Sequence, residues 1–183
     1  VLVFLFVEFY AAYMDYEGGI EVTERLIKEV VEATFGKTEF ETRGHKFDLS
    51  GVWKKISYVE TIKDMIGIDV LTSTDDEMRN KLEELGVKYE GANRERLTDT
   101  LWKYCRKQIS GPVWLIDVPK LVSPLSKAKT DNPLLTERVQ LILAGAECSN
   151  GFSELNDPVD QRERFEVQKK LIEAGDEEAM MPD

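Results

Sequence analysis

Two short stretches of the chain carry polar side chains at spacings that could form a binding site. The first runs from Glu147 to Asp157 and reads ECSNGFSELND. If it is a strand, Asn150, Phe152 and Glu154 lie on one face, because side chains two residues apart point the same way. An amide, an aromatic ring and a carboxylate in a row would suit the wall of a pocket for an amino acid. An edge strand with solvated polar side chains explains the same pattern equally well.

The second stretch reads EFYAAYMDY and runs from Glu8 to Tyr16. It follows the apolar residues 1–7, which we expect to form a buried strand. On such a strand Glu8 and Tyr10 share a face, and a carboxylate on the inner side of an apolar strand is costly to bury unless a cation meets it. A structural ion pair and a cationic ligand both meet that condition, and the pattern alone favours the ion pair.

Common catalytic motifs are absent from the sequence. There is no GxxxxGK[ST] or GxGxxG loop, no HExxH and no GxSxG. The one histidine, His45, lies beside Lys46 in a predicted hairpin, and we expect it to be structural. Cys105 and Cys148 lack a metal-binding spacing, which favours two reduced thiols in a cytoplasmic protein.

Helices and short strands alternate along the chain and must position these stretches. Apolar spacing, capping residues and glycine stops predict helices over 21–35, 57–67, 74–86, 93–108 and 157–174. Turn residues and β-rich runs predict a hairpin over 38–49 and strands over 113–117, 138–144 and 147–155. Strands with hairpin-type neighbours favour an α+β fold, with an antiparallel β-sheet flanked by helices, over βαβ units.

Composition narrows the class of protein. With 183 residues, 42% hydrophobic and 32% charged, the chain fits one globular domain. It has no run of about 18 apolar residues, so we expect no membrane association. A net charge of −11 repels phosphate backbones, and tRNA or other nucleic acid would need a separate basic region.

At these residues the chain resembles the class II lysyl-tRNA synthetases. The runs NGFSELND at 150–157, QRERF at 161–165 and AGDEEAM at 174–180 resemble the segment before the family's motif 3. VSPLSK at 122–127 and TER at 136–138 resemble stretches further upstream, and EFY at 8–10 with AYMDY at 12–16 resembles the end of motif 2. The NGFSELND run is highly specific, whereas the region 38–110 is much less so.

The resemblance implies a homodimeric cytoplasmic enzyme that activates lysine with ATP and Mg²⁺ and transfers it to tRNA-Lys. The carboxylate of lysine attacks the α-phosphorus itself, so the protein supplies positioning and charge stabilisation rather than a nucleophile. Five residues match lysine-binding positions, and Tyr10 and Glu154 are those that receive the ε-ammonium group. The five are Glu8, Tyr10, Asn150, Phe152 and Glu154.

The resemblance also implies nucleotide and metal positions. Glu147 matches an acidic residue that holds Mg²⁺ and ATP, and Phe4 falls where an aromatic ring stacks on adenine. Gln140 stands where the family has a second metal-binding glutamate; its amide oxygen can ligate Mg²⁺ but brings no charge. For lysine to be bound as implied, the strand with Glu8 and Tyr10 must lie beside the strand with Glu154.

The family's other catalytic parts have no counterpart in the sequence. These are motif 1, the arginine-bearing start of motif 2, motif 3 and the anticodon-binding OB domain. We therefore expect residues 1–183 to be part of a single catalytic domain, which alone neither forms lysyl-adenylate nor binds tRNA specifically. Two alternatives are a paralogue that attaches lysine to an elongation factor and a non-catalytic interaction module.

Overall fold

A four-stranded sheet forms the centre of the computed structural model, which describes residues 6–89 and 93–173. The strand order is β3 (Lys54–Ser57), β4 (Val113–Ile116), β7 (Arg138–Leu143) and β8 (Ala146–Phe152). β7 is antiparallel to both β4 and β8, whereas β3 and β4 are parallel. The sheet is therefore mixed: the predicted antiparallel pairing holds for β4–β7 and β7–β8 and is wrong for the β3–β4 pair.

The connection between β3 and β4 explains their parallel pairing. Parallel strands need a long crossover, usually a helix, because a tight hairpin can join only antiparallel neighbours. Between these two strands the chain forms α2 (Tyr58–Ile66), α3 (Asp75–Glu84) and α4 (Arg94–Arg106). The sequence predicted each of these helices, but it did not predict that they form the crossover of one βαβ-like unit.

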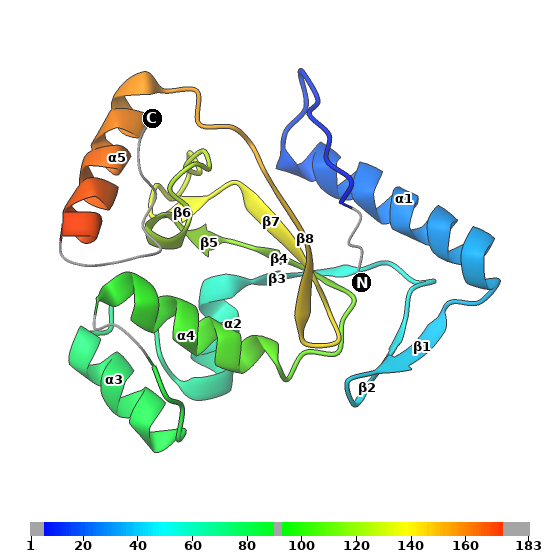
Figure 1. Cartoon of the computed structure of the whole chain (residues 1–183), viewed down its shortest axis with the longest axis horizontal. Helices are drawn as coiled ribbons and strands as arrows, with labels where there is room; N and C mark the ends of the chain where they lie inside the picture. The colour runs from blue at the N-terminus through cyan, green and yellow to red at the C-terminus, as the bar shows by residue number, and fades with distance from the viewer. Residues whose placement is uncertain (1–5, 90–92, 174–183) are drawn as a thin grey trace.

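Apolar residues cover both faces of the sheet. Leu115 and Ile142 belong to a buried cluster with α2, α3 and α4. Their chain neighbours Trp114 and Leu141 point to the opposite face and belong to a second cluster with α1 (Tyr16–Phe35). This is the period-2 alternation of strands, here with both faces covered. Figure 1 shows α1 and the α2–α4 group on opposite sides of the sheet.

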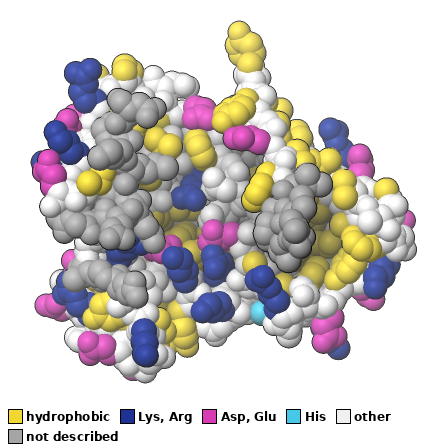
Figure 2. Space-filling view, in the orientation of Figure 1, with side chains coloured by type: hydrophobic (Ala, Val, Ile, Leu, Met, Phe, Trp, Pro, Cys, Tyr) yellow, Lys and Arg dark blue, Asp and Glu magenta, His cyan; other side chains and the backbone are white. Residues whose placement is uncertain are grey.

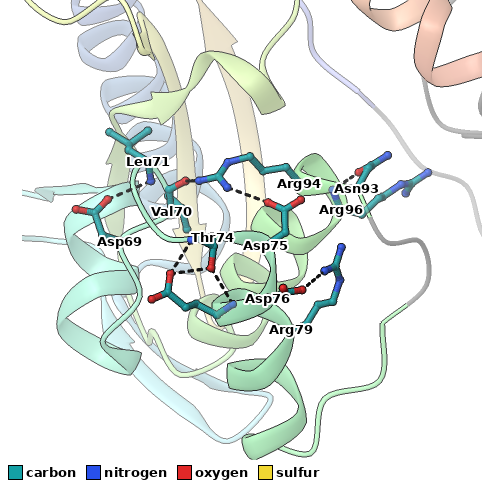
Figure 3. A network of polar contacts seen from close by, with 11 residues as sticks. Asp69, Val70, Leu71, Thr74, Asp75, Asp76, Arg79, Asn93, Arg94 and Arg96 are labelled. Carbon is teal, nitrogen blue, oxygen red and sulfur yellow. Dashed lines mark hydrogen bonds and ion pairs between the residues drawn. The ribbon is translucent and has the colours of Figure 1, made fainter.

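Polar contacts fix the start of α3 and α4 (Figure 3). Thr74 and Glu77 form the predicted capping box at the start of α3. Arg94, at the start of α4, donates to Asp75 at 2.9 Å and to the carbonyl of Val70 at 2.9 Å. These contacts tie the first residue of α4 to the beginning of α3 and to the loop before it.

The remainder of α4 is set by apolar packing. Leu97, Leu101 and Cys105 are fully buried, and Trp102 packs on the ring of Tyr58 with centroids 4.9 Å apart. Cys105 and Cys148 are free thiols in the structure, and burial raises the pKa of the Cys105 thiol to about 11, which makes it a poor nucleophile. The segment that follows α4 is held at the β7–β8 turn, because the carbonyls of Ser110 and Ile109 accept from the amides of Ala144 and Gly145 at 2.7 and 2.9 Å.

Two small antiparallel pairs complete the strands. They are β1 (Glu39–Thr42) with β2 (His45–Asp48), and β5 (Val118–Pro119) with β6 (Leu135–Thr136). The first is the predicted hairpin, and its turn residues Arg43 and Gly44 both have positive φ. A short 3₁₀ helix, η1 (Lys120–Val122), follows β5, and α5 (Pro158–Glu173) begins one residue after the predicted start at 157.

The segment before α1 differs from its prediction. Residues 6–10 are not in a strand, while residues 1–5 of the strand predicted over 1–7 lie outside the described residues; α1 begins at Tyr16, five residues before the predicted position 21. Asp15 caps the helix by accepting from the amide of Gly18 at 3.1 Å, a signal that apolar spacing alone does not show. Among the described helices, none is long and apolar enough to cross a membrane.

Candidate functional site

A β-bulge brings the polar residues of β7 and β8 to one face. Gln140 lies opposite Asn150, but the register then slips by one residue, so that Ile142 lies opposite Glu147. In a regular strand Glu147 would face away from Asn150, because the two residues are three positions apart. The extra residue of the bulge reverses this relation and returns Glu147 to the side of Gln140. Their contact confirms it, since the amide of Gln140 donates to Oε2 of Glu147 at 3.0 Å.

Arg138 organises the neighbouring part of this face. Its Nε donates to Oδ1 of Asn150 at 2.8 Å, and its Nη1 donates to the carbonyl of Val122 at 2.9 Å and to Oγ of Ser123 at 3.0 Å. Burial lowers the pKa of the Arg138 guanidinium, and the negative charge of Glu147 partly offsets this. Arg138 pairs with Phe152 in the register, so the ring lies at the same end of the strands.

Glu147 is held by donors on both oxygens. Arg106, the last residue of α4, forms an ion pair with Oε1, and Gln140 occupies Oε2. The Arg106 and Glu147 side chains are 19% and 34% exposed, so the pair is partly shielded from water. Figure 2 shows Lys and Arg side chains gathered over α4, with acidic side chains beside them.

These residues do not fit an ion held by the protein alone. Mg²⁺ takes oxygen ligands in near-octahedral geometry, commonly one or two carboxylates together with substrate phosphates. Gln140 presents its nitrogen to Glu147, and both carboxylate oxygens already have donors. Within residues 6–89 and 93–173, no group of three or more His, Cys, Asp and Glu side chains is placed to hold a metal ion.

Glu154 lies just beyond β8, where three segments meet. It forms an antiparallel bridge with Ser126, and the amide of Lys127 donates to the carbonyl of Ser153 at 2.9 Å. On the other side, Oγ of Ser153 accepts from the amide of Tyr16 at 3.0 Å. The stretch 123–127, the end of β8 and the start of α1 are thereby joined around Glu154.

Glu8 and Tyr10 lie near this junction. The Tyr10 hydroxyl donates to Oε1 of Glu8 at 3.0 Å. That hydrogen bond and the Glu8 charge raise the pKa of the Tyr10 phenol, and the charge of Glu154 adds to the same effect. The structure thus brings Tyr10 within electrostatic range of Glu154, although the segment that carries Tyr10 is not the predicted strand.

The environment of Glu8 also differs from its prediction. Glu8, Tyr10 and Glu154 are all exposed, so no buried carboxylate here requires a cation. The predicted structural ion pair of Glu8 is absent from the described part of the chain, and Glu154 likewise has no Lys or Arg partner there. Phe4, the residue matched to adenine stacking, lies outside the described residues.

Sequence reasoning missed two arginines that support this region. Arg106 carries no motif signal, because its role depends on where α4 ends relative to β8. Arg164 lies within the QRERF run that the resemblance used, but its contacts could not be read from spacing. It is 6% exposed and donates to the carbonyls of Ser123 at 3.2 Å and Ser126 at 2.6 Å, so it anchors the stretch that bridges to Glu154.

Comparisons with known proteins agree with this description. The family model of "tRNA synthetases class II (D, K and N)" matches residues 2–183. A lysine–tRNA ligase of Thermotoga sp. strain RQ2 is 43% identical over 180 residues, which are 98% of this chain and 36% of that protein. A lysine–tRNA ligase of Porphyromonas gingivalis strain W83 is 38% identical over 182 residues, or 98% of this chain and 32% of that protein. The chain spans about a third of the length of these curated relatives. It belongs to the class II tRNA synthetases of the D, K and N family.

Proposed function

We propose that this chain is the lysine-binding part of the catalytic domain of a lysine–tRNA ligase. The whole protein would activate lysine with ATP, form lysyl-adenylate and transfer the lysyl group to tRNA-Lys in the cytoplasm, as a homodimer. The observation that carries the proposal is the group formed by Glu8, Tyr10 and Glu154. It offers two carboxylates without a cationic partner among the described residues, in a chain whose relatives bear the name lysine–tRNA ligase.

The chemistry of this group suits an alkylammonium ligand. An ammonium group has three donors and no acceptor, and charge-assisted hydrogen bonds to carboxylates are the strong ones available to it. Glu154 would pair with the ε-ammonium of lysine, and the Tyr10 hydroxyl would contact its edge. The ε-ammonium is the one charge that separates lysine from an apolar amino acid of similar length, so Glu154 is the proposed selector.

Asn150 and Phe152 would line the rest of the pocket. Both belong to the face of β8 that also carries Glu147 after the bulge, which supports a lysine site and a nucleotide site that adjoin along one strand. Glu147 is the proposed residue of the ATP side. Contacts to tRNA would come from other parts of the protein, since a net charge of −11 disfavours a phosphate backbone here.

The experiment uses a chimera in which this chain replaces the matching segment of the Thermotoga lysine–tRNA ligase. Lysine-dependent ATP–pyrophosphate exchange is then measured with lysine and with norleucine, in the parent chimera and in the Glu154→Gln chimera. Glutamine keeps the shape of the side chain but removes its charge, and loss of one partner of such a pair costs about 2–5 kcal/mol, or roughly 30- to several thousand-fold in lysine affinity. The constant for ATP should change little.

A matched control removes a carboxylate from the exposed surface of α1. Glu29→Gln makes the same chemical change at a side chain that is 73% exposed, and it should leave both constants as in the parent chimera. If lysine discrimination survives Glu154→Gln while the ATP constant rises, Glu154 serves the nucleotide and the proposed role is wrong. A parent chimera that binds lysine but exchanges no pyrophosphate would favour a binding module over an enzyme.

A further inference from the structure

Arg106 is placed where it can act on Glu147 from a rigid support. It ends α4, whose first residue is tied to α3 and whose body is buried through Leu97, Leu101 and Trp102. Its Nη1 contacts Oε1 of Glu147, and its Nε is buried without a hydrogen-bond partner in the described structure. The guanidinium is therefore enclosed beside the carboxylate.

The charges of this cluster already balance. Arg106 contributes one positive charge, Glu147 one negative charge and Gln140 none, so these three sum to zero, and the nearby Arg138 guanidinium, whose pKa the Glu147 charge affects, adds further positive charge. A divalent cation binds where negative oxygen ligands outnumber positive groups, and a guanidinium beside the ligand repels it. Gln140 also disfavours a cation at Glu147, because its amide donates to Oε2 and occupies the second carboxylate oxygen.

We infer that Arg106 takes the place of a divalent metal ion at Glu147. Its guanidinium neutralises and orients the carboxylate, and Gln140 fixes the second oxygen, so the Gln140–Glu147 pair holds no Mg²⁺ of its own. This makes Arg106 a positioning residue that acts through Glu147. The inference rests on the proposed function only in assigning Glu147 to the nucleotide side of the site.

Binding of Mn²⁺ to the purified chain tests the inference directly. Mn²⁺ shares the oxygen ligands of Mg²⁺ and can be followed by electron paramagnetic resonance and calorimetry. The proteins compared are the wild-type chain, Glu147→Gln, Arg106→Met and the double variant Arg106→Met/Gln140→Glu. Lys103→Met is the matched control, because it removes a cation from the same turn of α4 whose partner is Asp99, 2.6 Å away.

The wild-type chain should show only weak, diffuse Mn²⁺ binding, which Glu147→Gln leaves unchanged. Arg106→Met should tighten binding, and the double variant should gain one site at least about tenfold tighter than any in the wild type, because the local charge falls by two units. Added Mn²⁺ should also raise the melting temperature of the double variant, while Lys103→Met behaves as the wild type.

Two results would overturn the inference. One is a wild-type Mn²⁺ site that Glu147→Gln removes, since that site would use the carboxylate that Arg106 is inferred to occupy. The other is unchanged Mn²⁺ binding in a folded Arg106→Met chain. Arg106→Met leaves Gln140 unchanged, so this single variant tests whether Arg106 excludes a divalent ion even if the double variant fails to fold. Metal binding here is measured without lysine or ATP, so this outcome is independent of lysine selection by Glu154.

Discussion

Replacing Arg164 with Met should destabilise the chain more than its place in the middle of the peripheral helix α5 suggests. Arg164 is 6% exposed, and its Nη1 donates to the carbonyls of Ser123, Pro124 and Ser126 at 3.2, 3.3 and 2.6 Å. Its Nε and Nη2 donate to Asp160 at 3.0 and 2.6 Å. Methionine keeps much of the volume but supplies no donor.

The expected magnitude follows from these contacts. Removal of one partner of a buried ion pair costs about 3–5 kcal/mol, and buried acceptors left without a donor cost about 1–3 kcal/mol. Lys120 lies 2.8 Å from Asp160 and remains as its partner, which lowers the cost of breaking the ion pair. Two of the three carbonyl contacts are long, which lowers the cost of leaving these acceptors without a donor. We therefore expect a loss of about 3 kcal/mol in the free energy of unfolding.

Urea unfolding, followed by tryptophan fluorescence and circular dichroism, measures this loss. With a urea slope of about 1–3 kcal/mol per M, the midpoint should fall by about 1–3 M. Arg164→Lys should recover only part of it, because a lysine lacks the fork that reaches carbonyls and carboxylate together. The control is Arg25→Met on α1, whose side chain is 75% exposed and whose contact with Glu29 is 4.0 Å long. A midpoint for Arg164→Met no lower than that of Arg25→Met would show that the contacts of Arg164 do not stabilise the chain.

Two further predictions concern the same fold. Hydrogen bonds from Arg164 first, and then Lys120, hold the pKa of the Asp160 carboxyl well below its usual range. This contribution is complete above the unfolded pKa of about 4 and is lost as pH falls towards the folded value, so the urea midpoint of the wild type should drop more steeply below about pH 4 than that of Asp160→Asn. Gly111→Ala should cost about 3 kcal/mol or more, because φ is +74° and a Cβ would stand 2.2 Å from the carbonyl oxygen of Ile142. Gly36→Ala, at φ +60° with no atom within 4 Å of the added Cβ, should cost only about 1 kcal/mol in the same unfolding measurement.

The helices could be predicted from the sequence because their signals are local. The predicted helices begin at Ser57, Thr74 and Asn93, and each of these side chains accepts a hydrogen bond from the amide three residues later. A cap needs only its own turn, so the same residues act whatever the rest of the fold does. The turn at Arg43 and Gly44 was predicted for the same reason.

The pairing of strands could not be predicted in the same way. Residues 54–57 and 113–116 carry no local signal for parallel pairing. The pairing depends on how the three helices that connect these strands in the sequence pack on the sheet. The start of α1 was missed by five residues because Asp15 is a cap that precedes a turn containing two glycines. The β3–β4 pairing and the start of α1 therefore depend on features that apolar periodicity within a short segment does not show.

The candidate site shows the same limit at the level of single side chains. Strict alternation places Asn150, Phe152 and Glu154 together and would place Glu147 on the other face. Only the bulge, a property of the pairing with β7, restores Glu147 to that face.

If Gln140 replaces a family glutamate, as the resemblance implies, the physical partner of that substitution is Arg106. A neutral amide at position 140 leaves Glu147 as the one carboxylate of the pair, and one carboxylate is what one guanidinium can neutralise. A second carboxylate at this 6% exposed position would add a buried negative charge that Arg106, already paired with Glu147, could not also balance. Gln140 and Arg106 are thus two halves of one electrostatic arrangement. Spacing could not reveal it, because 33 residues separate Arg106 from Gln140 and only the end of α4 brings them to the same carboxylate.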